Sequence, residues 1–294
     1  MLTHHLETPK APSRTVIIGS NSFVGKALIK QLEEAGAPVV ALGRAQVDLA
    51  QDEAGAALGG LLRADDTVVA ISAKAPCRNV DDFFENAKMI RSLVQAFETQ
   101  PVAHVVNISS DAVYPDEPVP LSETVPAAPG SMHGAMHLAR EVAFGALGLP
   151  LAILRPTLIY GASDPHNGYG PNQFRRKANA GEEIVLFGEG EERRDHVCVD
   201  DVAELTARVI MHRSTGLLNV ATGTVTSFRD IAEAAVRLSG RDVGISGRPR
   251  TGPMPHSGYR PFDPAATQAA FPDFSYIDLE TGMRDAQATE FKSG

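Results

Sequence analysis

The chain has 294 residues, of which 43% are hydrophobic and 21% charged, and its net charge at neutral pH is -9. This length allows one large α/β domain or a domain with a smaller lobe, and we favour the second arrangement. The acidic balance argues against general nucleic-acid binding, and no apolar run approaches the roughly 18 residues of a membrane-spanning helix. Small molecules are therefore the expected partners, with no nucleic acid and no membrane.

The amino terminus and the cysteines bear on the cellular location of the protein. Residues 1–14 carry charges and prolines without an apolar stretch, which predicts a flexible extension and not a signal peptide. Cys77 and Cys198 are too few for a disulfide framework and show no metal-ligand spacing. We predict two buried thiols, a cytoplasmic location and no metal.

Strands alternate with helices through the first half of the chain. Short apolar runs predict strands at residues 15–19, 38–42, 67–72, 102–109 and 151–154. Helical spacing predicts helices at residues 22–35, 80–99 and 134–147. This alternation implies parallel strands joined by right-handed crossovers. The predicted fold class is α/β, with a Rossmann-type doubly wound parallel sheet over residues 15–160.

Beyond Arg155 the regular alternation of strands and helices ends, and the sequence becomes rich in Gly, Pro and Asn. Short strands such as residues 183–187 mix there with helices at 199–211 and 227–238. We assign residues 161–294 mainly to a smaller α/β substrate-binding lobe. Parts of residues 190–225 are expected to return to the first domain.

The segment VIIGSNSFVGKAL, residues 16–28, predicts a dinucleotide-binding turn between a strand and a helix. Gly19 and Gly25 stand where a tight bend and a close helix contact are needed. The amides at the helix start, at Phe23 and Val24, can then face a pyrophosphate. Ser22 takes the middle glycine position, where it either narrows the approach to the phosphates or donates a hydrogen bond to one. A purely structural turn is the alternative.

The end of the second strand bears on which dinucleotide is bound. It reads ALGR, so that Gly43 stands where an acidic residue would bind the adenosine ribose, and Arg44 follows. An arginine there favours the extra phosphate of NADP, unless it is an ordinary surface cation. Asp48 and Leu49 are expected to cover the adenine edge. The predicted cofactor is NADP, with NAD as the alternative.

Several motifs in the right order resemble the extended short-chain dehydrogenase/reductase family, in particular its NAD-dependent epimerase/dehydratase group. GSNSFVG resembles the family's GGxGFxG, and VVNISSDAVY resembles its strand with the active-site Ser or Thr. RRDHVCVDDVA and YRPFD resemble its RDxxxVxDxA and RPxD segments. The resemblance implies a nucleotide-sugar substrate and a homodimer built on helices 80–99 and 134–147. It places a structural Asn at Asn86, which we assign to the cofactor site with Ser72, Ala73 and Pro156.

The helix that corresponds to the family's YGxxKxxxE segment departs from the family at its two reactive positions. Where the family reads YGxxKxxxE, this chain offers His133, Gly134, His137 and Glu141. The resemblance implies that the Tyr exchanges a proton with the sugar and that the Lys lowers its pKa and holds the ribose. Imidazole, with an ordinary pKa of about 6.5, can replace the Tyr as an acid or base. We therefore predict His133 as the replacement and His137 as a ribose contact that lacks the fixed charge of Lys.

Other interpretations of the two histidines stay open. Residues four apart share one face of a helix, so that His133 and His137 have a metal-ligand spacing, and both can also be inert replacements. Ser110 keeps the family's Ser/Thr position, where its hydroxyl can polarise the reacting sugar oxygen. The competing function is a noncatalytic protein that binds cofactor or nucleotide sugar without turnover.

The resemblance also implies the substrate contacts. Arg194 and Arg260 are expected to hold the diphosphate, a role that suits permanently charged guanidinium groups. The alternative for these two arginines is ion pairing with Asp195 or Asp263.

Two further residues, Asp111 and Asn172, are assigned to substrate binding. Ala112 follows Asp111, whereas the dehydratases of the group continue Thr-Asp-Glu. Keto-reduction or epimerisation is therefore favoured over dehydration.

Overall fold

The structure is a computed structural model that describes residues 1–117 and 119–293. The chain folds into two compact units. The first comprises Met1–Pro115, Glu123–Pro156 and Val202–Val220. The second comprises Asp116–Ser122, Thr157–Asp201 and Ala221–Gly294. Each unit has its own hydrophobic core.

The first unit is built on one seven-stranded sheet with the strand order β1-β10-β6-β5-β4-β2-β3. Its strands are β1 (Leu2–Thr3), β2 (Thr15–Ile18), β3 (Val39–Leu42), β4 (Thr67–Ala70), β5 (His104–Ile108), β6 (Leu151–Pro156) and β10 (Thr215–Val220). All pairings except that of β1 with β10 are parallel. This confirms the predicted Rossmann-type α/β class.

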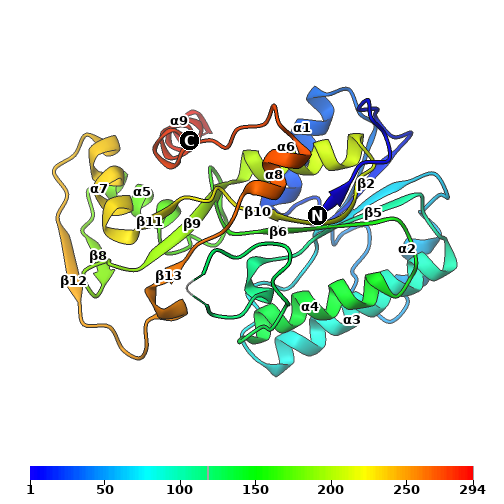
Figure 1. Cartoon of the computed structure of the whole chain (residues 1–294), viewed down its shortest axis with the longest axis horizontal. Helices are drawn as coiled ribbons and strands as arrows, with labels where there is room; N and C mark the ends of the chain where they lie inside the picture. Colours follow the sequence, from blue (N-terminus) through cyan, green and yellow to red (C-terminus); the bar gives the residue numbers. More distant parts are fainter. Residues whose placement is uncertain (118, 294) are drawn as a thin grey trace. The chain divides into compact units, whose positions relative to one another are not determined.

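Helices cover both faces of this sheet. They are α1 (Phe23–Glu34), α2 (Ala54–Gly59), α3 (Val80–Thr99), α4 (Met132–Gly145) and α6 (Val199–Met211), with the 3₁₀ turn η1 at Asp111–Val113. Helices α3 and α4 pack against each other on one face, and α1 and α6 lie on the opposite face (Figure 1). The central strands β2, β4 and β5 are fully buried, which explains why apolar residues predominate in them without alternating with exposed polar ones.

The starts of the predicted helices follow from side-chain caps. Ser22 accepts a hydrogen bond from the Gly25 amide at the start of α1. Asn79 does the same for Asp82 in α3, and Ser131 caps α4 at Gly134. Such caps satisfy amides that a helix leaves without an internal partner, so that they fix where the helix begins. Helix α4 therefore begins at Met132, two residues before its predicted start.

The amino-terminal segment differs from the predicted flexible extension. Strand β1 pairs antiparallel with β10, and the His4 ring hydrogen-bonds to the Ser214 hydroxyl at 2.7 Å. The backbone amides of Leu6 and Lys10 donate to carbonyls near the end of α6. Strand β1 thus covers the edge of β10, which the local sequence does not predict as a strand, and the residues after β1 are bonded to the end of α6.

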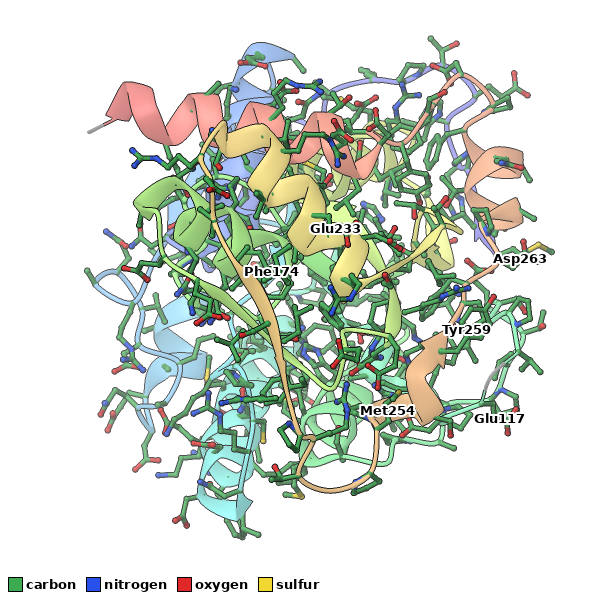
Figure 2. The ribbon with its side chains drawn as sticks, turned by 90° about the vertical axis from the view of Figure 1, so that its left-hand side faces the viewer. Glu117, Phe174, Glu233, Met254, Tyr259 and Asp263 are labelled. Atoms are coloured by element: carbon green, nitrogen blue, oxygen red, sulfur yellow. The ribbon has the colours of Figure 1, made fainter. Side chains whose placement is uncertain are left out.

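The second unit contains two small sheets and four helices among its described residues. One sheet joins β7 (Leu158–Tyr160), β9 (Arg193–Cys198), β11 (Val225–Ser227) and β13 (Tyr259–Arg260), and the other pairs β8 (Ile184–Phe187) with β12 (Ile245–Arg248). The helices are α5 (Pro171–Ala180), α7 (Phe228–Ser239), α8 (Ala265–Ala270) and α9 (Leu279–Ser293), with the 3₁₀ turn η2 at Pro255–Gly258. Figure 2 looks onto this unit, with Phe174 of α5 and Glu233 of α7 near its middle.

Candidate functional site

The turn between β2 and α1 is shaped by two glycines. Gly19 has φ +102°, and a Cβ there would come within 2.8 Å of the Ser72 amide nitrogen. A Cβ on Gly25 would overlap the carbonyl oxygen of Gly19. Both positions therefore require glycine, one for its backbone angle and both for space. The geometry also brings the predicted cofactor residues Gly19, Gly25 and Ser72 together.

The start of α1 has the chemistry of an anion site. Phe23 and Val24 are its first residues, and amides of a first helical turn have no partner within the helix. Their partial positive charge favours a phosphate group. The Ser22 hydroxyl accepts from the Gly25 amide at 3.0 Å, and a hydroxyl in that role keeps its own hydrogen to donate. The tight backbone turn that the two glycines allow, together with these amides, fits the pyrophosphate of a dinucleotide.

The segment after β4 is held in place by Asn86. Its side chain accepts from the Lys74 amide at 2.9 Å and donates to the Lys74 carbonyl at 3.0 Å. These bonds fix the backbone immediately after Ser72 and Ala73, which are half-buried. Asn86 thus fixes the chain next to these predicted cofactor residues through the backbone of Lys74. Pro156, the last residue of β6, lies opposite Val220 on the neighbouring strand.

Arg44 is an exposed cation with acidic neighbours. Its side chain is 74% exposed, with Asp48 at 3.6 Å and Glu85 at 3.9 Å. Hydrogen bonds from the backbone amide of Ala50 and from the side-chain amide of Gln51 lower the pKa of Asp48. Leu49 differs from its predicted role at the adenine edge, because its side chain is 3% exposed within the hydrophobic core.

The predicted chemical residues gather where η1 packs on α4. The Ser110 hydroxyl accepts from the Ala112 amide at 3.1 Å and donates to the Asp111 carboxylate at 3.4 Å. A Cβ on Gly134 would overlap the Ala112 carbonyl oxygen, so that glycine allows this close packing. Asp111 is also near enough to His133 to act on its charge.

His133 and His137 share one face of α4, as their spacing predicts. Their ring centroids lie 4.7 Å apart with the planes at 88°. The Cys77 backbone amide donates to Nδ1 of His133 at 3.4 Å. His137 is buried, and its Nδ1 has no hydrogen-bond partner among the described residues. Burial lowers the pKa of both rings, that of His137 well below its ordinary value of 6.5.

The sequence motifs do not identify two buried arginines, Arg140 on α4 itself and Arg155, which is bonded to α4. Arg140 is 1% exposed and donates to the carbonyls of Ser72, at 2.9 Å, and Ile108. Arg155 forms a bidentate pair with Glu141 at 2.9 and 2.6 Å. The available sequence signal was a charged side chain on the apolar face of α4, three residues after His137.

The second unit places Arg194 and Arg260 side by side. They are register partners in the parallel strands β9 and β13. Arg194 pairs with Glu192 at 2.8 Å, and Arg260 is 2% exposed and donates to Asp116 at 3.3 Å. Of the predicted acidic partners, Asp195 instead accepts hydrogen bonds from Thr157, Thr222 and Gly223.

The surroundings of these two arginines are rich in positive charge. Arg250 also pairs with Glu192, at 3.2 Å, and Arg260 contacts the ring of His256 at 3.0 Å. Burial first, then the nearby Arg194 and Arg260, lower the pKa of His256. In Figure 2, Met254 and Tyr259 mark the segment that enters β13, next to the loop of Glu117. The arrangement can bind an anion with more than one negative charge.

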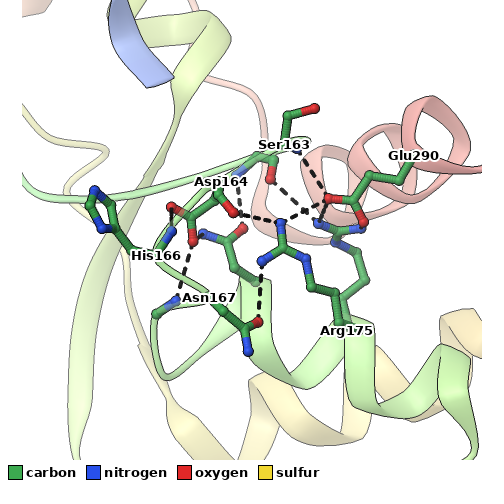
Figure 3. Close-up of polar contacts among 10 residues, drawn as sticks. Ser163, Asp164, His166, Asn167, Arg175 and Glu290 are labelled. Carbon is green, nitrogen blue, oxygen red and sulfur yellow. Dashed lines mark hydrogen bonds and ion pairs between the residues drawn. The ribbon is translucent and has the colours of Figure 1, made fainter. Parts of the chain in front are cut away.

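Asn172, assigned to the substrate, is committed to a network within the second unit. Its side chain accepts from the Gly161 amide at 3.0 Å and donates to Asp164 at 3.0 Å. Arg175 and Arg176 on the same helix pair with Glu290 of α9 (Figure 3). The amide of Asn172 therefore holds the loop after β7, so that its polar atoms already serve the fold.

Neither a metal centre nor a membrane segment is formed by the described residues. Their His, Cys, Asp and Glu side chains make no group of three or more that can hold a metal ion. None of their helices has the length and apolar character needed to cross a membrane.

Fold and turn together define a dinucleotide-binding α/β protein. The chain belongs to the NAD dependent epimerase/dehydratase family, whose model matches residues 15–221. This confirms both the family resemblance and a nicotinamide dinucleotide as the cofactor.

Individual relatives agree with this assignment. The chain is 30% identical over 253 residues to a UDP-glucose 4-epimerase of Mycolicibacterium smegmatis, covering 75% of this chain and 81% of the relative. It is 26% identical over 291 residues to a dTDP-4-dehydro-6-deoxy-D-allose reductase of Streptomyces bikiniensis, covering 80% and 85%. The structure of the Thermus thermophilus UDP-glucose 4-epimerase in complex with NAD superposes with a TM-score of 0.81 at 21% identity, covering 96% and 99%. That structural likeness confirms the fold.

Proposed function

We propose that the protein is an NAD(P)-dependent reductase or epimerase that acts on a nucleotide-activated sugar. The observation that carries this proposal is the turn from Gly19 to Gly25, whose geometry fits a dinucleotide, in a chain of this family. Curated relatives are an epimerase and a reductase of nucleotide sugars. In this proposal the first unit binds the cofactor and carries Ser110 and His133, and the second carries Arg194 and Arg260 for the nucleotide of the substrate.

The cofactor would be held by backbone amides of the turn and by the ends of β2, β4 and β6. When bound, a nicotinamide dinucleotide supplies or accepts a hydride. Gly19, Gly25 and the amides of Phe23 and Val24 would accommodate its phosphates. Ser22 would donate a hydrogen bond to one phosphate oxygen.

We favour NADP over NAD because Arg44 lies at the position that reads the ribose. A 2′-phosphate would compete with the carboxylates of Asp48 and Glu85 for this guanidinium. Both pairs are long, at 3.6 and 3.9 Å, and Arg44 is largely exposed, so that little interaction is lost on exchange. Replacing Arg44 by Ala should weaken NADPH binding and leave NADH binding unchanged.

On the substrate side, Arg194 and Arg260 would hold the diphosphate of the nucleotide. Their pairing in neighbouring strands supports this role, because it presents two guanidinium groups together. Replacing either by Ala should weaken nucleotide-sugar binding without altering cofactor binding. Unchanged sugar binding would remove the assignment.

The reacting sugar oxygen would meet Ser110 and His133. Ser110 would polarise it by a hydrogen bond, with Asp111 nearby as a substrate contact. Ala112 supplies no acid for removal of water, which favours keto-reduction or epimerisation. Loss of activity in His133→Ala would support a chemical role for His133.

A noncatalytic binding protein is the second candidate, favoured because burial lowers the pKa of both rings and so weakens each as a proton acceptor. The double substitution His133→Tyr with His137→Lys separates the candidates. A gain of oxidoreductase activity only in the double variant would favour the noncatalytic native protein.

We further propose a homodimer formed by α3 and α4. Large apolar side chains are exposed on these helices: Val80 is 57%, Phe84 64% and Val142 65% exposed. Water contact with such residues favours burial against a second copy. Sedimentation should give a dimer for the native protein and a monomer for Phe84→Glu. A monomeric native protein would overturn this part.

A cytoplasmic location completes the proposal. Cys77 and Cys198 are unpaired, buried thiols, and burial raises the pKa of each above its ordinary value of 9.0. Protonated buried thiols fit a reducing compartment.

The decisive experiment is calorimetric titration of the cofactor-stripped protein with NADPH and NADH. Tight NADPH binding is expected and would justify screening nucleotide sugars for turnover. Binding of neither dinucleotide would overturn the oxidoreductase proposal.

A further inference from the structure

Arg140 is a buried cation that makes no direct ion pair with a carboxylate of the described residues. Its guanidinium donates to two backbone carbonyls, those of Ser72 and Ile108. Its Nε has no hydrogen-bond partner in the same part of the chain. The adjacent Glu141 is already engaged, because its two oxygens accept from Arg155 and Ser109. A buried charge without a paired countercharge is costly, and such an arrangement commonly marks a functional site.

The position of Arg140 relates it to both histidines of α4. It follows His137 by three residues, so that the two share one face of the helix. Of the two residues whose carbonyls it binds, Ser72 follows the end of β4 by two residues and Ile108 is the last residue of β5, so that both lie within two residues of the predicted site residues Ala73 and Ser110. Its charge acts on both rings and disfavours a second positive charge on either.

The protonation of His133 can be assigned from its hydrogen bond. A backbone amide only donates, so the contact from Cys77 requires a lone pair on Nδ1 of His133. In a neutral imidazole with an accepting Nδ1, the hydrogen is on Nε2. A ring in this tautomer can donate a hydrogen bond through Nε2, but it has no lone pair there to remove a proton.

We propose that Arg140 is the fixed positive charge of this site and, with the Cys77 amide, holds His133 as a neutral hydrogen-bond donor. The chemical role of this neutral ring rests on the proposed function. In that role His133 polarises a carbonyl oxygen of the substrate through Nε2–H instead of abstracting a proton from a hydroxyl. Arg140 is a positioning residue, since it acts through His133 and the two strand ends.

Other charged and titratable groups also face His133. Asp111 approaches from η1 and raises its pKa, whereas burial and Arg140 lower it, and His137 lies one turn along α4. Cys77 contacts it through the backbone amide. The balance of these groups leaves the pKa of His133 below the ordinary value of 6.5, with burial as the largest cause.

The test is nitrogen NMR of the full chain labelled in its nine histidines. His133 is assigned by comparison with His133→Gln. Couplings across the ring distinguish the two neutral tautomers, and a pH series gives the midpoint of titration. We expect the Nε2–H tautomer and a midpoint below that of an ordinary histidine. An Nδ1–H tautomer, or an ordinary midpoint, in the native protein would overturn the proposal.

Variants then isolate the charge of Arg140. Arg140→Met removes the charge and keeps much of the stem, and it should raise the titration midpoint of His133. Arg140→Lys should keep the native midpoint. Arg91→Met is the matched control, because it removes the same charge from an exposed position of α3. An effect of Arg140→Met no larger than that of Arg91→Met would refute the role of Arg140.

Two safeguards keep the result decisive. If Arg140→Met does not fold, Arg140→Gln removes the charge while retaining amide donors for the carbonyls. The same samples are titrated with NADPH by calorimetry. The expected tautomer together with absent NADPH binding would support this inference and overturn the proposed function. An Nδ1–H tautomer together with NADPH binding would overturn this inference and leave the proposed function standing.

Discussion

Glu141 anchors α4 to the sheet beneath the candidate site. Its carboxylate is 5% exposed and accepts two hydrogen bonds from Arg155, at 2.9 and 2.6 Å. It also accepts the Ser109 hydroxyl at 2.5 Å. One side chain thus links the helix of the two histidines to β6 and to the segment after β5.

Replacing Glu141 by Gln should destabilise the protein strongly. The substitution keeps the volume but leaves Arg155, 7% exposed, as a buried charge without its partner. Removing one partner of a buried pair costs about 3–5 kcal/mol. Replacing both Glu141 and Arg155 by Met should recover most of this loss, because neither member of the pair then leaves its partner as an uncompensated buried charge.

Urea unfolding followed by far-ultraviolet circular dichroism measures the effect, since the chain has no Trp for fluorescence. Glu34→Gln is the matched control, because it removes a carboxylate from an exposed pair with Lys30 on α1. This control should change the free energy of unfolding by less than about 1 kcal/mol. A change of similar size in Glu141→Gln would refute the reasoning.

Gly25→Ala should lower NADPH affinity at least about tenfold, because its Cβ overlaps the Gly19 carbonyl; calorimetry measures this. Gly145→Ala, with open space around it, should leave affinity unchanged. Partial burial raises the pKa of Glu290, but hydrogen bonds from Arg175 and Arg176 outweigh it and lower the pKa to about 2. Because the folded pKa lies below the ordinary 4.5, this stabilisation is present above pH 4.5 and lost as pH falls toward 2. On acidification, Glu290→Gln should therefore lose less free energy of unfolding than the native protein, by about 1 kcal/mol after solvent screening. Equal losses in the two proteins would contradict this.

Local signals were sufficient for the main helices and strands of the first unit. The helix predicted at residues 80–99 has those bounds in the structure, because Asn79 caps its start and apolar residues recur with helical spacing. Strand β10 and the short β1 were missed. Their pairing depends on contacts between residues about 210 apart in the chain, such as that of His4 with Ser214, which no local window contains.

The site residues also divide into those that local sequence identifies and those that depend on contacts between distant parts of the chain. Arg194 and Arg260 were assigned from separate motifs, but their proximity depends on the register of β9 and β13. Leu49 was assigned to the adenine edge from its place in the chain, whereas core packing buries it. Arg140 was overlooked because its significance comes from burial beside carbonyls of two strands, and a charged residue in a helix usually lies on the surface.

The sequence by itself determined the α/β class, the dinucleotide turn and the replacement of the Tyr and Lys by histidines, because these depend on periodicity, on glycine's backbone freedom and on residue identity. Only the tertiary structure decided which groups surround those histidines. The tautomer of His133 depends on an amide 56 residues away in the chain, and the nearby charge on the burial of Arg140. Desolvation and hydrogen bonding act between neighbours in space, so they exist only once the strands and helices have packed.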